Sequence, residues 1–404
     1  MQGLTREADN SFNRQRIALF EPYPDLVTNP TLVCLLQALT RHGSRVDVMM
    51  HHTGSLGSVN SNIAVYRFPE GLSLWYGDVR TTCRCWSERL SIERLRIEQR
   101  FAAGAYDLIL GIDSLGIIRG SKYAKRYNVP LVYLSFEMFF RDELIVDSEI
   151  EEKEQEIKAT QMADLVVVQD AHRGRLLAEE NGLVLDKFAY LPVSPSGSRQ
   201  VKRSNYLRDR FHLSEEQTIV LQSGTFADWT YADELLKSLD AWPEGFVLVI
   251  HSRDRLNDTS RYVREIKAAD LPNIILSTEP LPADEYEQLV GSADMGLVMY
   301  KATPPSRYLQ KNIEYIGLAS GKFSFYMKYG IPVISVADRT YQGLLEYYNF
   351  GENIDSFDEL PDALIRVRSS ENHHRAEAQR LFRERLDFDV YWPTLSARLL
   401  EIMK

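Results

Sequence analysis

The chain has 404 residues, of which 44% are hydrophobic and 26% charged, and its formal net charge is -10 at pH 7. This length accommodates about two domains, and the composition is that of a soluble globular protein. The negative charge argues against a general nucleic-acid binder, which needs a concentrated positive surface. No apolar run reaches the roughly 18 residues of a membrane span, and the N-terminal stretch lacks the apolar core of a signal peptide. We therefore expect a cytoplasmic protein.

The three cysteines, Cys34, Cys83 and Cys85, form no recognisable disulfide or metal pattern. An odd number cannot pair completely, and the close pair lacks the second Cys or His cluster that would complete a zinc site. We expect free thiols, which suit a reducing compartment, and no metal site.

Apolar runs alternate with helix-like segments in the first half of the chain. The expected strands are residues 16–23, 44–50, 106–113, 129–136 and 163–170, and the expected helices include 31–43, 86–104, 116–128 and 171–182. Strands that are apolar throughout need cover on both faces, which is typical of a parallel sheet. The first half therefore predicts a doubly wound α/β domain.

A connection rich in Pro, Ser and Gly interrupts this pattern, which then starts again. The second set of expected strands is 218–224, 246–252, 273–278, 295–300 and 331–337. We expect an N-terminal Rossmann-like acceptor domain at 1–195, a linker at 196–215, a C-terminal Rossmann-like nucleotide-sugar domain at 216–387, and a last helix within 388–404 that crosses back to the first domain. Two such domains usually bind a ligand in a central cleft that the carboxyl ends of both sheets face.

The strand ends of the second half are rich in groups that suit a diphosphate. Glycines let backbone N–H groups approach a phosphate, hydroxyls add donors, and lysine or arginine supplies charge. The expected donor-binding residues are Ser223, Gly224, Thr225, His251, Arg253, Leu281, Tyr300, Ser320, Gly321, Lys322 and Tyr326. For Gly224, His251 and Arg253 an ordinary loop role remains the alternative.

Lys322 carries the strongest signal in this set. It stands in "SGKFSFYMKYGIPVIS", which predicts a loop, a helix, a glycine stop and a buried strand. The macrodipole disfavours a cation at a helix N-terminus, but a phosphate that shares the site would bind both the lysine and the exposed N–H groups. We therefore expect Lys322 to contact a phosphate.

The second half resembles the nucleotide-sugar domain of GT-B glycosyltransferases, especially the family-4-like group. The resemblance lies in "IVLQSGTF", "PADEYEQLVGSADMGLVMY" and "SGKFSFYMKYGIPVI". In that group a Ser/Pro-x-Lys, Tyr, Gly-x-Pro-Val pattern lies over the donor diphosphate, and the residues here that match it are Ser320, Lys322, Tyr326, Gly330, Pro332 and Val333. The resemblance implies a GT-B fold and a nucleotide-sugar donor, for which we favour UDP over GDP.

One family feature is absent. Many family-4-like enzymes carry two glutamates eight residues apart, the second of which binds the donor ribose just before the tyrosine. These positions hold Gly317 and Phe325 here, and neither side chain accepts a hydrogen bond. Glu314 lies nearby but out of register.

The first half offers two carboxylates directly after buried strands. Asp113 and Glu137 are the candidates for acceptor-side catalysis, and His51 and His52 are in reserve. A cap or loop role is the alternative for each carboxylate. The segment from Arg80 to Arg100 concentrates arginines, which predicts either a solvated helix face or a patch for an anionic acceptor or a membrane surface.

The leading hypothesis is a metal-independent hexosyltransferase that moves a sugar from a nucleotide diphosphate sugar to a hydroxyl acceptor and needs no further cofactor. Lys322, an arginine of the 251–255 loop and backbone N–H groups would stabilise the leaving diphosphate. The family resemblance favours retention of configuration. The alternatives are a sugar-nucleotide epimerase of the same fold and a catalytically silent nucleotide-binding or scaffold member.

Overall fold

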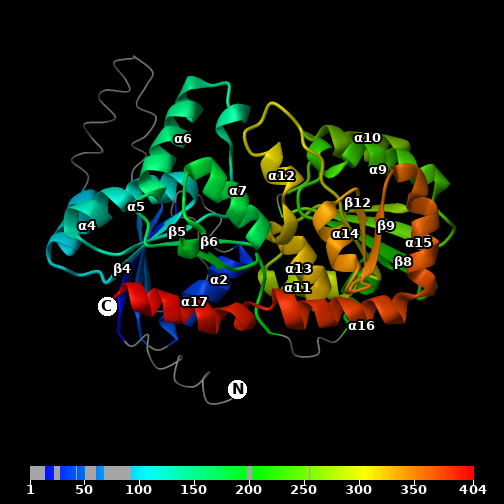
Figure 1. Ribbon diagram of the computed structural model, residues 1–404. Helices are drawn as coiled ribbons and strands as arrows, with labels where there is room; N and C mark the ends of the chain where they lie inside the picture. Colours follow the sequence, from blue (N-terminus) through cyan, green and yellow to red (C-terminus); the bar gives the residue numbers. More distant parts are fainter. Residues whose placement is uncertain are drawn as a thin grey trace. The chain divides into compact units, whose positions relative to one another are not determined.

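The computed structural model describes residues 14–21, 28–41, 43–50, 61–67, 92–197, 203–253 and 255–404. The chain divides into two compact units (Figure 1). Unit 1 comprises Met1–Val193 and Tyr391–Lys404, and unit 2 comprises Ser194–Val390. Each unit is a parallel sheet between layers of helices, so the predicted α/β class with two doubly wound domains is confirmed.

The sheet of unit 1 has seven parallel strands in the order β3-β2-β1-β4-β5-β6-β7. Their bounds are β1 Arg16–Glu21, β2 Arg45–Met50, β3 Ile63–Arg67, β4 Leu108–Ile112, β5 Leu131–Leu134, β6 Leu165–Val168 and β7 Phe188–Tyr190. The helices are α2 Pro30–Thr40, α4 Ile92–Ala102, α5 Asp113–Tyr127, α6 Asp147–Thr160, α7 Ala171–Asn181 and most of α17 Phe388–Ile402. Apolar side chains of β1, β4, β5 and β6 form one core with those of α4, α5 and α7.

The C-terminal helix α17 belongs mainly to unit 1. Arg398 on this helix donates hydrogen bonds to the backbone carbonyls of Phe188, in β7, and Asp186. These bonds attach the end of the chain to the edge strand of the first sheet.

The sheet of unit 2 has six parallel strands in the order β10-β9-β8-β11-β12-β13. Their bounds are β8 Thr218–Ser223, β9 Phe246–His251, β10 Ile274–Ser277, β11 Met295–Val298, β12 Val333–Val336 and β13 Gly351–Ile354. The helices are α8 Tyr206–Phe211, α9 Ala232–Ser238, α10 Arg261–Ala269, α11 Ala283–Gly291, α12 Lys311–Glu314, α13 Gly321–Lys328, α14 Arg339–Leu345, α15 Leu360–Ser369 and α16 Glu371–Leu381.

Alternate residues of β8 point to opposite faces of the second sheet, because side chains alternate along a strand. Leu221 contributes to the core with α8, α11, α13 and α16, whereas Val220 contributes to the core with α9, α10 and α15. Both faces of the strand are therefore buried, which explains its continuous apolar run.

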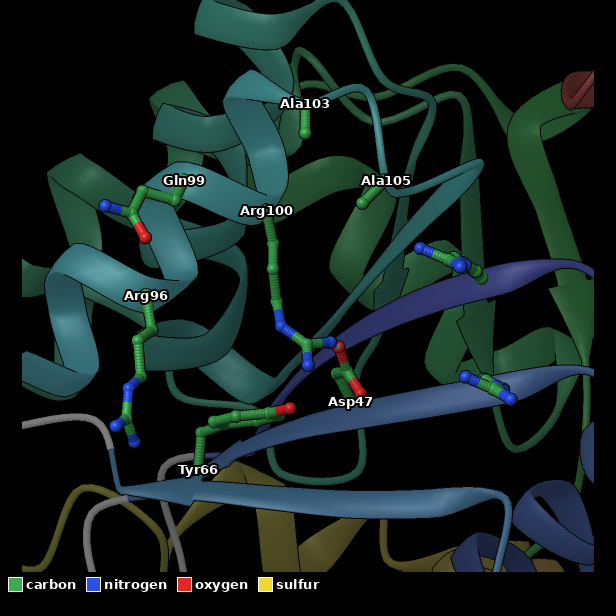
Figure 2. Close-up of a pocket in the computed structure, with 9 residues that line it drawn as sticks. Asp47, Tyr66, Arg96, Gln99, Arg100, Ala103 and Ala105 are labelled. Carbon is green, nitrogen blue, oxygen red and sulfur yellow. Dashed lines mark hydrogen bonds and ion pairs between the residues drawn. The ribbon is translucent and has the colours of Figure 1, made fainter.

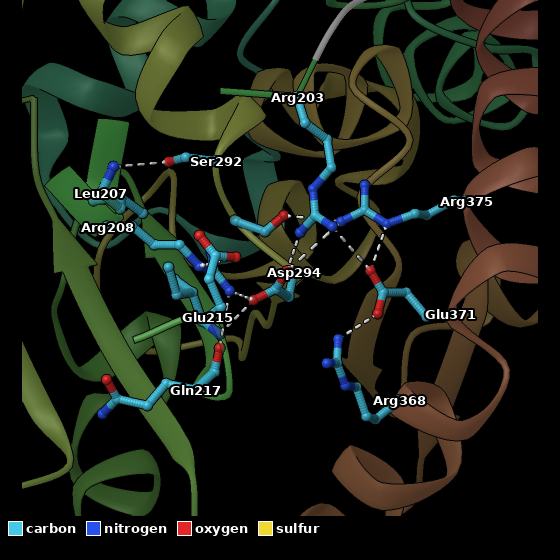
Figure 3. Close-up of polar contacts among 12 residues, drawn as sticks. Arg203, Leu207, Arg208, Glu215, Gln217, Ser292, Asp294, Arg368, Glu371 and Arg375 are labelled. Atoms are coloured by element: carbon cyan, nitrogen blue, oxygen red, sulfur yellow. Dashed lines mark hydrogen bonds and ion pairs between the residues drawn. The ribbon is translucent and has the colours of Figure 1, made fainter. Parts of the chain in front are cut away.

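Two carboxylates, the buried Asp294 and the partly buried Glu371, attach the start of unit 2 to its sheet (Figure 3). Asp294, at the start of β11, is 1% exposed and pairs with Arg203 and, at 3.0 Å, with Arg208. It also accepts a hydrogen bond of 2.8 Å from the backbone N–H of Ile219. Glu371 pairs with Arg375 at 2.8 Å and also with Arg368. The arginines before and within α8 are therefore neutralised by acids of the unit itself.

Several elements escaped the sequence prediction, and most of them have weak apolar patterns. The strands β3, β7 and β13 are edge strands of their sheets. The missed helix α6 reads "DSEIEEKEQEIKAT" and has few apolar residues. In the described part of the chain no helix is both long and apolar enough to span a membrane.

The Asp294 cluster leads to a prediction about stability. Asp294→Asn keeps an acceptor for Ile219 but removes the charge that pairs with three arginines, Arg203, Arg208 and Arg375, so we expect the free energy of unfolding to fall by about 2 to 4 kcal/mol. Urea denaturation followed by circular dichroism measures this. Asp284→Asn, on the exposed first turn of α11, is the matched control and should cost only a few tenths of a kcal/mol. Equal effects of the two changes would contradict the prediction.

Candidate functional site

The order of the second sheet reverses between β8 and β11, which places a topological switch point at their carboxyl ends. Open α/β sheets bind ligands at such points. Ser223 ends β8, Tyr300 follows β11, and α13 begins nearby with Gly321 and Lys322. Four of the predicted donor-binding residues therefore belong to three chain segments around one position in unit 2.

Tyr326 connects α13 to the end of β8. Its hydroxyl donates to the carbonyl of Leu221 at 2.9 Å and accepts from the backbone N–H of Ser223 at 3.1 Å. The Ser223 Oγ lies 3.0 Å from the same hydroxyl and 3.2 Å from that of Tyr286. Because the Tyr326 side chain is fully buried and these partners occupy its hydroxyl, its role in the site is to position Ser223.

The packing around Tyr326 also explains a glycine in β11. A Cβ on Gly296 would lie 2.5 Å from ring atoms of Tyr326, so no larger residue fits there. The bare backbone of β11 lets α13 approach the sheet closely.

His251 ends β9 beside this network. It is 1% exposed, and its Nδ1 lies 3.0 Å from the Ser277 Oγ. Burial, together with the nearby positive charge of Arg210, lowers the pKa of His251 to about 4. The imidazole is therefore neutral at pH 7 and adds no charge for a phosphate.

The turn after β8 contains Gly224, whose missing side chain leaves space beside the end of the strand. Gly224 has φ +90°, a left-handed value that favours glycine, and no atom lies within 4 Å of where its Cβ would be. Its N–H donates to the carbonyl of His251 at 2.9 Å. Thr225 follows with an exposed side chain, and its carbonyl accepts from the Thr230 hydroxyl at 3.2 Å.

Ser320 is the N-cap of α13. Its Oγ accepts from the N–H of Phe323 at 3.3 Å and lies 2.7 Å from the hydroxyl of Tyr300. The N–H groups of Gly321 and Lys322 belong to the first turn, where a helix supplies no internal acceptors. The start of α13 is thus fixed by a buried serine, with two backbone donors at its end.

Lys322 is partly buried at this position and has no carboxylate partner among the residues that the structure describes. Its Nζ lies 4.8 Å from the centre of the Tyr300 ring. With the Gln222 amide oriented so that it donates to the Leu297 carbonyl, its oxygen accepts from Nζ at 3.2 Å. Burial lowers the pKa of Lys322 to about 7. Among the described residues only neutral groups contact this cation, an environment in which an added anion would stabilise its charge.

Trp229 and Gln222 belong to the same site, and the sequence analysis did not single them out. The Trp229 ring stacks on Tyr300 with centroids 6.0 Å apart and an interplanar angle of 11°. The carbonyl of Trp229 accepts from the N–H of Lys301 at 2.9 Å. The sequence could have indicated Trp229 as a site residue, because it is an aromatic residue shortly after a strand that ends at a switch point.

Lys301 differs from Lys322 in its electrostatics. Its Nζ lies 2.8 Å from Asp228 and 2.7 Å from Glu234. Burial disfavours its charge, but these two carboxylates outweigh that effect and raise the pKa of Lys301. Lys301 is therefore a cation that the protein itself neutralises.

Other predicted residues lie less directly at this point. Arg253 is exposed, Arg255 pairs with Glu279 at 2.7 Å, and Leu281 packs against the core under α11 and α13. At the positions where the family carries glutamates, Phe325 packs edge-on against Tyr286 and Gly317 is buried. Glu314 is exposed at the end of α12.

In unit 1 the two predicted carboxylates lie close together but differ in environment. Asp113 follows β4 with φ +50°, is 5% exposed, and accepts from the N–H groups of Phe136 at 2.7 Å and Glu137 at 2.9 Å. Burial, reinforced by the charge of Glu137, raises the pKa of Asp113 to about 8. The Glu137 side chain is exposed. Asp113 therefore fixes the turn that presents Glu137.

A third carboxylate belongs to the same end of the first sheet. Glu21 ends β1, is 1% exposed, and lies on the strand that pairs with β4 at the switch point of this sheet. The sequence analysis did not select it, because it stands within a run of strand residues. The reserve candidates His51 and His52, and the arginines from Arg80 to Arg89, lie outside the described residues.

Metal binding has little support in the described part of the chain, where no group of three or more His, Cys, Asp or Glu side chains could hold an ion. Cys34 is a buried free thiol.

The state of Lys322 predicts a pH-dependent stability. Its pKa is about 7 in the folded protein and near 10.4 in an unfolded chain, so between these values the unfolded chain binds more protons and stability rises with pH. Lys322→Met should abolish this rise. Without ligand we expect the variant to be more stable than wild type at pH 7, by about 1 to 3 kcal/mol, and the difference to shrink toward pH 10.

Urea denaturation of both proteins at several pH values from 7 to 10 measures this difference. Lys328→Met is the matched control, because Lys328 lies on the same helix but pairs with Glu287 at 3.3 Å. The control should lose stability slightly. A Lys322→Met protein that is clearly less stable than wild type at pH 7 would mean that the lysine supports the fold.

Asp113 predicts the opposite dependence in unit 1. A carboxyl whose pKa is raised to about 8 in the folded state stabilises the protein fully below pH 4, and this contribution is lost as pH rises to about 8. Asp113→Asn keeps the acceptor for both N–H groups and cannot ionise. The variant should therefore gain stability over wild type between pH 5 and pH 8.5, by about 1 to 3 kcal/mol. Urea denaturation measures the free energy of unfolding of both proteins across this range. A difference between them that does not change with pH would contradict the prediction.

No protein-family model and no curated protein matches this chain. Solved structures match it along almost its whole length. HepE of Anabaena in complex with UDP is 14% identical, with a TM-score of 0.70 over 96% of this chain and 100% of that one. Sucrose-phosphate synthase of Thermosynechococcus elongatus is 13% identical, with a TM-score of 0.68 over 96% and 98%.

A third structure, α,α-trehalose 6-phosphate synthase of Burkholderia multivorans, is 12% identical, with a TM-score of 0.63 over 96% and 99% of the two chains. HepE has also been solved in complex with UDP-glucose. The family-4-like assignment remains a prediction. At the level of fold the resemblance seen in the sequence is confirmed, and the chain has the GT-B fold.

Proposed function

We propose that the protein is a glycosyltransferase that takes a hexose from a nucleotide diphosphate sugar and transfers it to a hydroxyl acceptor. The observation that carries this proposal is Lys322, a partly buried cation at a helix start and a switch point, with no carboxylate partner in the described chain. Structural neighbours solved with UDP and UDP-glucose support a UDP-sugar as the donor.

In this proposal the diphosphate replaces the missing counter-charge of Lys322. The N–H groups of Gly321 and Lys322 donate to phosphate oxygens, and Gly224 lets the ligand approach the end of β8. The Trp229–Tyr300 pair forms an aromatic wall beside the lysine. As the sugar leaves, negative charge grows on the diphosphate, and Lys322 stabilises it without a requirement for a metal ion.

The transfer itself forms a bond between the acceptor oxygen and the anomeric carbon, and the acceptor hydroxyl gives its proton to a carboxylate base. The bond from that carbon to the diphosphate oxygen breaks, and its electron pair leaves with the nucleoside diphosphate. Glu137 is the proposed acceptor-side carboxylate because its side chain is exposed, whereas Asp113 holds the turn before it. Retention of configuration follows from the sequence resemblance alone.

Activity is tested by incubating the protein with UDP-glucose and other nucleotide sugars, with and without candidate hydroxyl acceptors, and measuring free nucleotide. Release that depends on an acceptor supports the transferase. Interconversion of the donor indicates an epimerase, and binding without turnover indicates a catalytically silent member. The lack of activity would then be attributed to the absence of both family glutamates, whose positions hold Gly317 and Phe325.

UDP binding should be coupled to protonation of Lys322. At pH 8 a group with a pKa of about 7 is mostly neutral, and a diphosphate beside it favours the charged form, so binding should take up about one proton. Titration calorimetry in HEPES and in Tris, whose ionisation enthalpies differ, measures this uptake. Uridine should cause none.

Lys322→Met should lose the proton uptake and bind UDP at least about tenfold more weakly, and its turnover should fall about a hundredfold. Lys301→Met is the control for a neighbouring cation that has its own carboxylate partners. Undiminished uptake in Lys322→Met would place the diphosphate elsewhere.

A further inference from the structure

A second cationic site lies in unit 1, in a cavity of about 630 Å³ that the proposed function does not use (Figure 2). Nine residues line it: Arg16, Arg45, Asp47, Tyr66, Arg96, Gln99, Arg100, Ala103 and Ala105. Four arginines face one aspartate, so the lining carries an excess of positive charge in a chain whose net charge is -10.

The register of the first sheet explains how the cavity forms. Arg16 pairs with Arg45, and Asp47 pairs with Ala64. Residues two apart on a strand share a face, so Arg45 and Asp47 lie on one face together with Arg16 and Tyr66. The helix α4 and the segment after it supply the remaining lining residues. Arg16 and Arg45 begin their strands, so this cavity lies at the amino ends of β1 and β2.

Among the described residues that line the cavity, Asp47 is the one acid, and it already has partners. Asp47 is 7% exposed, forms an ion pair with Arg100, and accepts from the Tyr106 hydroxyl at 2.7 Å. Arg100 also lies over the Tyr66 ring at 5.0 Å. Asp47 and Arg100 therefore neutralise each other in the lining of the cavity. Figure 2 shows the Arg100 side chain extended toward Asp47.

The other three arginines lack such a partner. Arg16, Arg45 and Arg96 are exposed, and no carboxylate in the described residues forms an ion pair with them. Three guanidinium groups at one cavity repel each other unless an anion lies between them. Guanidinium forks match the oxygens of a phosphate better than any other side chain does.

We infer that this cavity binds a phosphomonoester carried on a hydroxylated body. Its volume exceeds what one phosphate fills and lies within the range of small-ligand sites. Beyond the arginines, the Gln99 amide and the Tyr66 hydroxyl can bind hydroxyl groups of the ligand. Burial raises the pKa of Tyr66, so its hydroxyl keeps its proton at neutral pH. A soluble sugar phosphate and a phosphorylated inositol lipid headgroup share this chemistry.

The test uses a triple variant, Arg16→Gln with Arg45→Gln and Arg96→Gln. It leaves the Asp47–Arg100 pair intact, and the changed side chains are exposed, so the fold should be kept. The matched control removes the same charge elsewhere in unit 1, through the exposed residues Lys125→Gln, Lys158→Gln and Arg175→Gln. Circular dichroism checks that both variants fold.

Calorimetry at low ionic strength compares glucose 6-phosphate with glucose, and flotation compares phosphatidylcholine vesicles with and without phosphatidylinositol 4-phosphate. We expect binding of at least one phosphorylated probe, weakened about tenfold or more in the triple variant and changed less than about twofold in the control. Binding of glucose 6-phosphate alone identifies a soluble ligand, and binding of the phosphorylated vesicles alone identifies a lipid headgroup.

The inference is overturned if neither phosphorylated probe binds, if the triple variant binds as wild type does, or if the control weakens binding equally. Lys322→Met should bind the phosphorylated probe as wild type does, and the triple variant should bind UDP as wild type does. Failure of this inference is thereby distinguished from failure of the proposed function.

Discussion

The candidate donor site depends on one unbalanced charge. Lys322 is partly removed from water at the positive end of a helix, and in the described chain only neutral groups surround it. Both burial and the helix dipole disfavour its charged form, and burial alone lowers its pKa to about 7. A protein gains no stability from such an arrangement. In the proposed function a diphosphate that brings negative charge to this point would relieve this cost and gain affinity from it.

The surrounding structure holds this lysine in place. Ser320 caps the helix and meets Tyr300, and Tyr326 on the next turn binds three groups of β8. Gly296 provides the space that the Tyr326 ring needs. These contacts connect α13 to both strands at the switch point. The position of Lys322 relative to Gly224 is therefore set by buried hydrogen bonds, which is the rigidity that a phosphate site requires.

Sequence reasoning predicted the central strands, because buried parallel strands are apolar throughout, and several of the helices between them. It failed for β3 and β13, which are edge strands with partly exposed side chains, and for the polar helix α6. Lys322 was recognisable because its charge conflicts with the helix start. The roles of Tyr326 and Asp113 were not, because a hydroxyl that binds the backbone of another strand, or a carboxylate that holds a turn, depends on contacts between distant residues.

Charge balance separates structural cations from candidate ligand-binding ones in this molecule. Arg208 and Lys301 each meet carboxylates of the same unit, and removing those acids would leave a cation unpaired. Lys322 in unit 2 and the cavity residues Arg16, Arg45 and Arg96 in unit 1 have no such acids in the described residues. A chain with a net charge of -10 has more carboxylates than cations, so its composition does not explain why these cations have no carboxylate partner among the described residues. Their partners are then expected to be anions that the protein binds.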